Sequence, residues 1–378
     1  MFLAFGATSS MVMGVSSIMP MIPSLARVFD VSITTASLVI TIFTMPGIVF
    51  ALFSGLLADR IGRRAVLAPA LLLFVVAGVG CAFATSFEAL LVLRFFQGMG
   101  AAPLGVLNAT IIADTWSGRE MTSRIGYNIM VLNICTAIYP SLGGLLAHFD
   151  WRFPFMLPVL ALPVFLTAAA TPLASPGAVC SIKKYVGDAF SLFRTRRMAA
   201  LYAMTFVTFL LLFGPIITGF PVFADARFAA SPATIGSVMI FSSIGAAVTS
   251  SQLGRLMGRF SPRSLLVCSQ ALYVVSLAFL PNLPQLGWML LPVFMYGMGM
   301  GLNTPNVQAQ LLQAAPAAQR ASVMAVNGML LRFGQTLAPV CFSFLMARHG
   351  PEWGLYSGIV LALVLAVLAV FFLPGRQE

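Results

Sequence analysis

Two arginines, Arg94 and Arg332, fall within long apolar stretches of the chain, whereas the other basic residues lie between such stretches. A stretch of about 20 apolar residues can span a bilayer, and a charge inside one is costly, so such a residue is a functional candidate. Arg332 comes thirteen residues after the expected start of its helix at residue 319, close to the bilayer midplane. All ten acidic residues fall in loops or at helix ends. A midplane cation without a carboxylate favours a neutral or anionic small molecule over a permanently cationic one.

Side-chain amides accompany Arg332 on two predicted helices. Asn303, Asn306 and Gln310 follow one another at steps of three and four, so they share one helical face, which should line water or a partner helix. In a competing interpretation, carbonyls and amides such as Asn303 neutralise Arg332 in a purely structural network. The predicted substrate-binding residues are Asn128, Asn133, Asn303, Asn306, Gln310, Asn327, Arg332 and Gln335.

The composition indicates that the bilayer surrounds these residues. Hydrophobic residues make up 60% of the 378-residue chain and charged residues 8%, far below the quarter or so expected of a soluble domain. The five cysteines have no CxxC spacing and both histidines fall in loops, so no metal, no cofactor and no enzymatic activity are expected. We predict an all-α polytopic membrane protein with helices near residues 2–26, 35–58, 65–86, 88–113, 120–147, 153–173, 198–223, 233–257, 263–280, 287–314, 319–347 and 353–373.

The connections between these helices differ in charge. Of the 21 basic residues, fifteen fall on one side and four on the other, while the acidic residues divide five and five. Because basic residues are retained in the cytoplasm, both termini are predicted to be cytoplasmic, in a multi-pass protein of the inner (plasma) membrane. The net charge of +11 follows from this topology and does not indicate nucleic-acid binding.

The chain divides into two halves around a basic linker that contains Pro172 and Pro176. The halves repeat in one register: positions 199 residues apart pair Gly98 with Gly297, Asn128 with Asn327 and Pro140 with Pro339. Parallel repeats are typical of transporters with a central site. We therefore predict a six-helix bundle at 1–173, a cytoplasmic linker at 174–197 and a second bundle at 198–378, acting as a monomer.

The connection between the second and third predicted helices has the most specific motif. It contains Gly55, Asp59, Arg60, Gly62, Arg63 and Arg64 in the pattern G-x-x-x-D-R-x-G-R-R. This segment resembles the loop signature of the major facilitator superfamily, and the resemblance extends over almost the whole chain. It implies twelve helices in two pseudo-symmetric bundles and a loop in which Asp59 forms a charge-assisted latch that favours one conformation.

Two further motifs are similar to signatures of that superfamily. Arg94, Gln97 and Gly98 match a fourth-helix signature, in which the arginine tunes a proton relay or, alternatively, snorkels outward or braces Gln97. Pro140, Gly143 and Gly144 match the fifth-helix motif of the antiporter branches, although Tyr139 and Cys135 replace two of its glycines. A kinked, closely packed gate helix is expected there.

The resemblance to the twelve-helix drug:proton antiporter branch implies proton-coupled efflux of a small amphipathic compound by alternating access. Asp30 and Asp114, near the ends of predicted helices, are the titratable candidates for coupling. The alternatives are a siderophore, metabolite or organic-anion exporter or importer of the same fold. A membrane-embedded enzyme lacks its motifs here, and a channel does not account for the repeat together with the loop.

Overall fold

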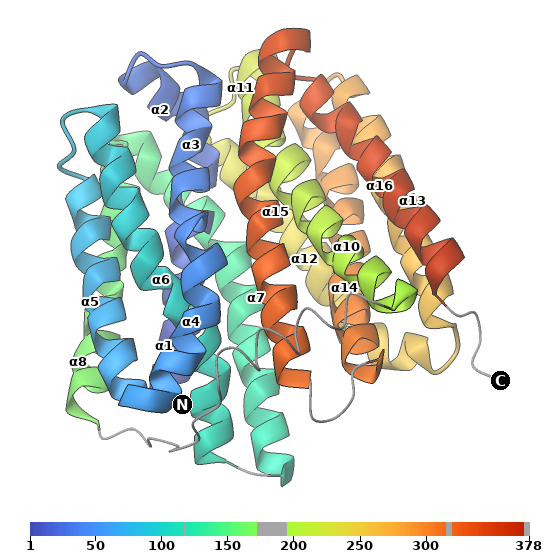
Figure 1. Ribbon diagram of the computed structural model, residues 1–378. Helices are drawn as coiled ribbons and strands as arrows, with labels where there is room; N and C mark the ends of the chain where they lie inside the picture. Colours follow the sequence, from blue (N-terminus) through green and yellow to red (C-terminus); the bar gives the residue numbers. More distant parts are fainter. Residues whose placement is uncertain (117, 172–194, 315–319, 374–378) are drawn as a thin grey trace.

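The computed structural model describes residues 1–116, 118–171, 195–314 and 320–373. The first half of the described chain contains α1 (Phe2–Ser16), α2 (Ile22–Val28), α3 (Ile33–Thr44), α4 (Pro46–Ile61), α5 (Arg63–Cys81), α6 (Phe87–Thr115), α7 (Gly118–Phe149) and α8 (Leu162–Ala170). The second half contains α10 (Arg196–Leu211), α11 (Phe220–Phe228), α12 (Pro232–Met257), α13 (Pro262–Phe279), α14 (Leu290–Ala314), α15 (Arg320–His349) and α16 (Trp353–Phe372). Figure 1 shows these helices side by side in two groups.

The helices make twelve passes. Short helical turns join α1 to α2 and precede α8, and a π-helical segment, η4 (Leu212–Gly219), joins α10 to α11. Eleven helical segments of the described chain are long and apolar enough to cross a membrane. The twelfth pass is α14, which packs along α12 and α13 although its amide side chains make it less apolar. The predicted all-α fold of twelve membrane helices is confirmed, and the helices begin and end within a few residues of the predicted positions.

Glycine contacts reproduce the internal repeat in three dimensions. Gly98 of α6 lies directly against the Phe43 carbonyl of α3, where a Cβ atom would clash. Gly297 of α14 lies in the same way against the Ser242 carbonyl of α12. Gly297 follows Gly98 by 199 positions, and Ser242 follows Phe43 by the same number. Such close backbone approach is how small residues let membrane helices pack. A second contact repeats in this register, between Gly100 and Ala70 and between Gly299 and Ser269.

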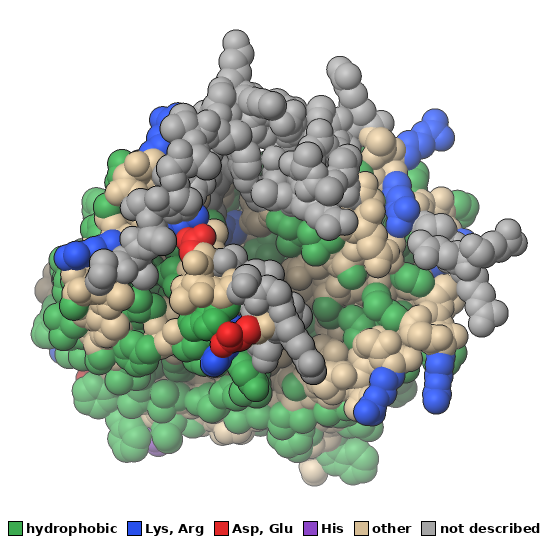
Figure 2. Space-filling view, turned by 90° about the horizontal axis from the view of Figure 1, so that it is seen from below, with side chains coloured by type: hydrophobic (Ala, Val, Ile, Leu, Met, Phe, Trp, Pro, Cys, Tyr) green, Lys and Arg blue, Asp and Glu red, His purple; other side chains and the backbone are tan. Residues whose placement is uncertain are grey.

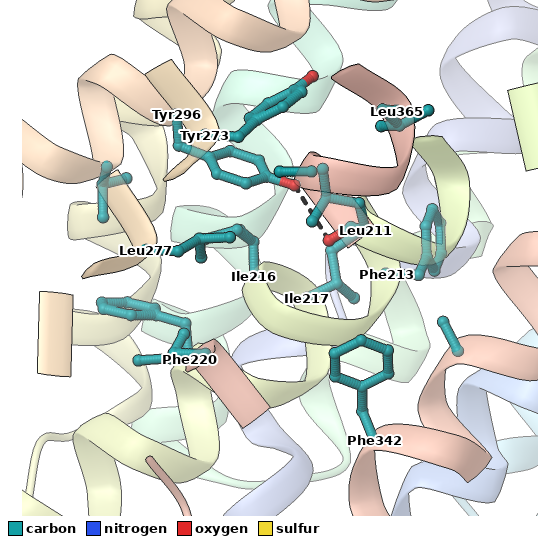
Figure 3. Packing of buried hydrophobic residues seen from close by; sticks show 14 of the residues in the cluster. Leu211, Phe213, Ile216, Ile217, Phe220, Tyr273, Leu277, Tyr296, Phe342 and Leu365 are labelled. Carbon is teal, nitrogen blue, oxygen red and sulfur yellow. Dashed lines mark hydrogen bonds between the residues drawn. The ribbon is translucent and has the colours of Figure 1, made fainter. Parts of the chain in front are cut away.

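A hydrogen bond from Tyr296 to Leu211 lies in the core of the second bundle (Figure 3). Pro215 lies inside η4 and has no N–H to donate. The buried Tyr296 hydroxyl of α14 donates to the carbonyl of Leu211, the last residue of α10, at 3.0 Å. Phe213, Ile216 and other apolar side chains pack in the same cluster. The bond holds the junction of α10 and η4 against α14.

The two ends of the molecule differ. We call the face where α1 begins and α16 ends the terminal face, and the other the opposite face (Figure 1). Basic side chains gather around the terminal face in Figure 2, and Arg60, Arg64, Arg255 and Arg259 are exposed. This asymmetry agrees with the predicted orientation, which stays a prediction, as do the bundle boundaries. Most of the predicted linker lies outside the described residues.

The bundles are sealed together toward the opposite face. Among the described residues, the hydrogen bonds and ion pairs between bundles run from Arg27–Asp225 at that face to Thr44–Thr336 at the deepest point. Nearer the terminal face, a Cβ atom added at Gly254 or Gly328 would meet nothing within 4 Å. The described hydrogen bonds between the bundles thus lie on the side of Thr44–Thr336 that is nearer the opposite face.

Candidate functional site

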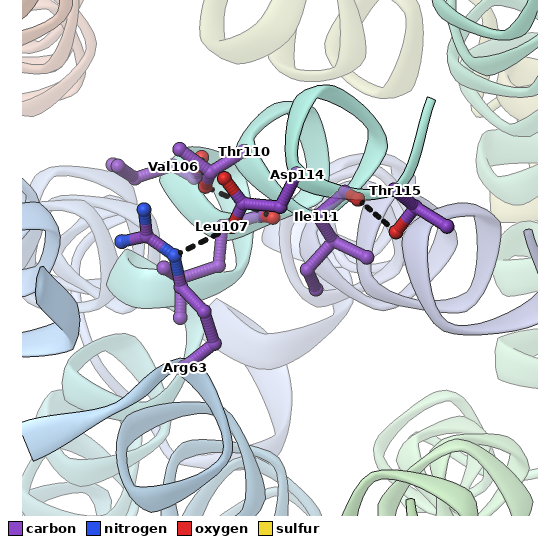
Figure 4. Close-up of polar contacts among 7 residues, drawn as sticks. All are labelled: Arg63, Val106, Leu107, Thr110, Ile111, Asp114 and Thr115. Carbon is purple, nitrogen blue, oxygen red and sulfur yellow. Dashed lines mark hydrogen bonds and ion pairs between the residues drawn. The ribbon is translucent and has the colours of Figure 1, made fainter. Parts of the chain in front are cut away.

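The loop between α4 and α5 places Arg63 against the end of α6. Gly62 ends α4 with a φ of 97°, a conformation that glycine adopts without strain, and Arg63 begins α5 directly afterwards. The Arg63 side chain is almost fully buried, and its Nε donates to Asp114 Oδ2 of α6 at 2.9 Å (Figure 4). Asp114, predicted to couple protons, is thus held in an ion pair that braces the loop.

The other residues of this loop motif contribute less to the described contacts. Arg60 is exposed, and a Cβ atom at Gly55 would meet Val106 of α6 at an ordinary distance of 3.6 Å. The side chain of Asp59 lies outside the described residues, so its latch stays a prediction. Asp30, the second coupling candidate, is exposed in the turn after α2 and has a φ of 51°.

Arg94 braces the interior of the first bundle. It is 1% exposed. Its Nη1 donates to Gln97 Oε1 at 2.7 Å and its Nε to the Val39 carbonyl at 3.1 Å. The guanidinium carbon lies 4.2 Å from the ring centre of Phe43, a cation–π contact. This geometry fits the interpretation that Arg94 braces Gln97. The buried Arg94 side chain does not extend outward to the membrane surface. A part in proton coupling stays a prediction.

The antiporter-like motif lies in the seal. Gly144 of α7 contacts the Pro232 carbonyl of α12, and Gly236 of α12 contacts the Pro140 carbonyl in return. Gly143 lies against the Ser17 carbonyl within the first bundle. Each glycine sits where a Cβ atom would overlap the facing backbone. These residues let α7 approach α12 closely at the opposite face.

Hydroxyl groups form the rest of the seal, along α3 and α15. Thr336 Oγ1 lies 3.0 Å from Thr44 Oγ1, and Thr41 donates to the Thr336 carbonyl at 3.1 Å. Nearer the opposite face, Ser343 donates to Ser37 at 2.8 Å. We name this set the hydroxyl seam: Thr34, Ser37, Thr41, Thr44, Thr336 and Ser343. Our sequence prediction missed it, although the α3 members follow one another at steps of three, four and three, the spacing of one helical face.

Arg332 lies one turn before Thr336 on α15, beyond the last described hydrogen bond between the bundles. Its guanidinium reaches across to the first bundle: a Cβ atom at Gly47 would lie 2.7 Å from Nη1, and one at Gly105 would lie 3.1 Å from Nη2. The residue is partly exposed, and its guanidinium has no hydrogen-bond acceptor or acidic partner among the described residues. Two glycines thus make room for a cation with free donors between the bundles.

The predicted amides divide into two groups. Asn303 and Asn306 are fully buried, and they donate to Thr208 Oγ1 at 2.7 Å and to the Pro262 carbonyl at 2.9 Å. Gln310 is 3% exposed and accepts from Arg197 at 2.8 Å. These three join helices within the second bundle, so the structure does not bring them to Arg332 and does not use Asn303 to neutralise it. This differs from the predicted binding set, because partner helices cover the polar face of α14.

The remaining amides lie on α7 and α15. Asn128 accepts from Thr8 at 2.7 Å, and Asn327 accepts from Thr205 at 2.6 Å. Both asparagines are buried between helices of their own bundle. Asn133 and Gln335 are partly exposed, and Gln335 shares α15 with Arg332. Within the described part of the chain, Arg332 and the partly exposed amides are the predicted binding residues nearest to solvent.

The family model of the Major Facilitator Superfamily matches residues 4–229 and 216–378. The chain belongs to the major facilitator superfamily. It is 28% identical over 344 residues to the multidrug resistance protein MdtL of Escherichia coli O139:H28, with 86% of this chain and 83% of MdtL covered. It is 23% identical to the bacillibactin exporter of Bacillus subtilis strain 168, with 97% and 94% covered.

Two solved structures of transporters have the same fold. A D-xylose–proton symporter aligns with a TM-score of 0.81 and 15% identity, covering 99% of this chain and 98% of its own. The nucleoside transporter NupG aligns with a TM-score of 0.79 and 16% identity, covering 98% and 96%. Membership makes the chain a multi-pass membrane transporter of small molecules and not an enzyme.

Proposed function

We propose that this transporter exports a small amphipathic compound, neutral or anionic, in exchange for protons. The observation that carries the proposal is the Arg332 guanidinium, which lies between the bundles at the inner end of the seal without an acidic partner among the described residues. A cation at that depth attracts an anionic or hydrogen-bond-accepting group and repels a cationic one. The names of MdtL and of the bacillibactin exporter support export.

The seal supports transport by alternating access. The hydroxyl seam and the Arg27–Asp225 pair join the bundles toward one face, and the described hydrogen bonds between them do not extend toward the terminal face beyond Thr44–Thr336. With the predicted cytoplasmic termini, this arrangement is inward-facing, and a compound from the cytoplasm reaches Arg332 first. Transport then requires the seam to open while the terminal ends of the bundles close together.

Proton coupling is assigned to Asp114 or Asp30, and their surroundings distinguish the two. Asp114 is paired with the buried Arg63, so its protonation would weaken the contact between the loop and α6. Asp30 lies exposed beside α2, near the ion pair of the seal. Protonation of either residue would act through conformation, because neither is adjacent to Arg332 along the chain or in the described contacts.

The test uses the purified chain in liposomes with an imposed pH gradient. The probes are 6-hydroxy-2-naphthoate (an anion), its methyl ester (neutral) and tetraphenylphosphonium (a cation). We expect the gradient to drive transport of the anion and the ester but not of the cation. Arg332→Ala should weaken anion binding, whereas Arg348→Ala, at an exposed position, should not. Preferred transport of the cation would refute the substrate class, and full gradient-driven transport by both Asp30→Asn and Asp114→Asn would refute the coupling residues.

A second candidate function is export or import of a siderophore or another organic anion. The unpartnered Arg332 and the resemblance to a bacillibactin exporter favour it. Comparing naphthoate uptake with a catecholate chelator in vesicles of both orientations separates this candidate from a general efflux pump. Transport of the catecholate alone would favour the siderophore, and uptake in right-side-out vesicles would favour import.

A further inference from the structure

The two bundles contain the same pair of side chains between their first and fifth helices. In the first bundle, the Thr8 hydroxyl donates to Asn128 Oδ1 at 2.7 Å. In the second, the Thr205 hydroxyl donates to Asn327 Oδ1 at 2.6 Å. Thr205 follows Thr8 by 197 positions and Asn327 follows Asn128 by 199, so the pairs occupy equivalent places. All four residues are buried.

The surroundings of the two pairs differ at the position of Asn108. In the first bundle, Asn108 of α6 donates its Nδ2 to Thr8 Oγ1 at 2.7 Å, so the hydroxyl both donates and accepts. The position 199 residues later is Val307 of α14, which has no donor. Among the described residues, the single Thr205 hydroxyl proton faces two acceptors, Asn327 Oδ1 at 2.6 Å and the Leu201 carbonyl at 3.2 Å, and Thr205 Oγ1 accepts no hydrogen bond. The acceptor that Asn108 fills in one bundle is free in the other.

A hollow lies at this free acceptor. Its walls include Thr205 and Thr208 of α10, Thr304 and Val307 of α14, and Asn327 of α15. Thr304 Oγ1 is a buried atom without a hydrogen-bond partner in the described structure. The hollow has room for about one water-sized group. Leaving such hydroxyls unsatisfied away from water is costly, so a polar group that entered the hollow would be stabilised.

The hollow and Arg332 both involve α15. Asn327 precedes Arg332 by five residues on α15, which corresponds to about 7–8 Å along the helix axis. The hollow therefore lies nearer to the terminal face than the Arg332 guanidinium does. The helix that contributes to both, α15, packs against both bundles. Five residues also correspond to about 140° around the helix, so Asn327 faces α10 of its own bundle while Arg332 faces the first bundle.

We propose that this hollow is a subsite for a neutral O–H or N–H donor of the transported compound, a hydroxyl or an amide, which takes the place that the Asn108 amide occupies in the first bundle. The proposal rests on the function proposed above and specifies its substrate: an amphipathic compound that has one small O–H or N–H donor in addition to its anionic or accepting group. Compounds that carry a bulky or purely accepting group at that place are disfavoured.

The test compares 6-hydroxy-2-naphthoate with 6-methoxy-2-naphthoate, which differ only in the donor. Binding to the purified full-length chain in detergent is followed by naphthoate fluorescence. We expect the wild type to bind the hydroxy compound about tenfold more tightly, a difference typical of one buried hydrogen bond. Val307→Asn supplies the amide from the protein and fills the hollow, so it should bind both compounds with the weaker affinity.

Two further variants keep the test decisive if Val307→Asn folds poorly. Val307→Ala leaves the hollow open without an amide and should keep the preference for the hydroxy compound. Thr205→Val removes the acceptor at nearly constant shape and should abolish the preference. Equal binding of both compounds by the wild type, or a preference that survives in Thr205→Val, would overturn the subsite alone. Failure of the wild type to bind either naphthoate would overturn the proposed substrate class and the subsite with it.

Discussion

Arg332 and Gly47 belong to different bundles, yet the Arg332 side chain occupies the space that a side chain at position 47 would fill. A Cβ atom there would lie 2.6 Å from Arg332 Cδ and 2.7 Å from Nη1. The glycine therefore sets where the cation points. This contact crosses the bundle interface at the inner end of the hydroxyl seam, so the same arginine borders both the seal and the space below it.

Gly47→Ala should displace the Arg332 guanidinium. We expect affinity for 6-hydroxy-2-naphthoate to fall by about tenfold, the size of a lost charged hydrogen bond, with a smaller change for the methyl ester. Fluorescence titration measures both. Gly328→Ala is the matched control, because its Cβ atom would meet nothing within 4 Å. An unchanged anion affinity in Gly47→Ala would mean that the position of Arg332 does not govern binding.

Thr336→Val should loosen the hydroxyl seam. The threonine bonds Thr44 across the interface, and one such bond contributes about 0.5–1.5 kcal/mol, a twofold to tenfold change in the balance of conformations. Hydrogen–deuterium exchange of α3 and α15 should increase. Thr167→Val, whose hydroxyl bonds only within α8, serves as the control. If exchange in the seam rises no more than in the control, the seam does not hold the bundles closed.

The Arg27–Asp225 pair should contribute to the seal mainly because its two charges are opposite. Its arginine side chain is 60% exposed, so we expect the pair to add no more than about 1 kcal/mol and to weaken in high salt. Arg27→Asp places two acids together and should speed exchange at the opposite face, while the swap with Asp225→Arg should restore it. Swapping Arg227 and Glu352, which pair within the second bundle, should leave the seal unchanged. A swap that fails to restore the seal would exclude a role for this pair.

Asp114→Asn should destabilise the fold in addition to any effect on coupling. The change removes the charge that faces Arg63, a side chain only 6% exposed, and we expect a loss of about 1–3 kcal/mol. Thermal unfolding in detergent should show it. Asp30→Asn is the control, since asparagine accepts a positive φ as readily as aspartate and the residue is exposed. Equal melting temperatures for the two variants would contradict the bracing role of Asp114.

The sequence alone determined the twelve helices, the two-part repeat and the family, because these depend on local properties. Apolar length defines a membrane helix wherever it packs, and small residues such as Gly98 and Gly297 mark close contacts that recur at a fixed spacing. The loop from Gly55 to Arg64 has its residues adjacent in the chain, so its motif could be read directly.

Only the tertiary structure decided which polar residues face the space between the bundles. Asn303 and Asn306 share a helical face with polar spacing, but that spacing is the same whether the face meets water or a neighbouring helix, and here helices cover it. The hydroxyl seam and the Gly47–Arg332 contact join residues nearly 300 positions apart, so no local pattern could pair them. The free acceptor at Thr205 depends on which side chains of α10, α14 and α15 meet around it, because a hollow is defined by what its neighbours leave unfilled.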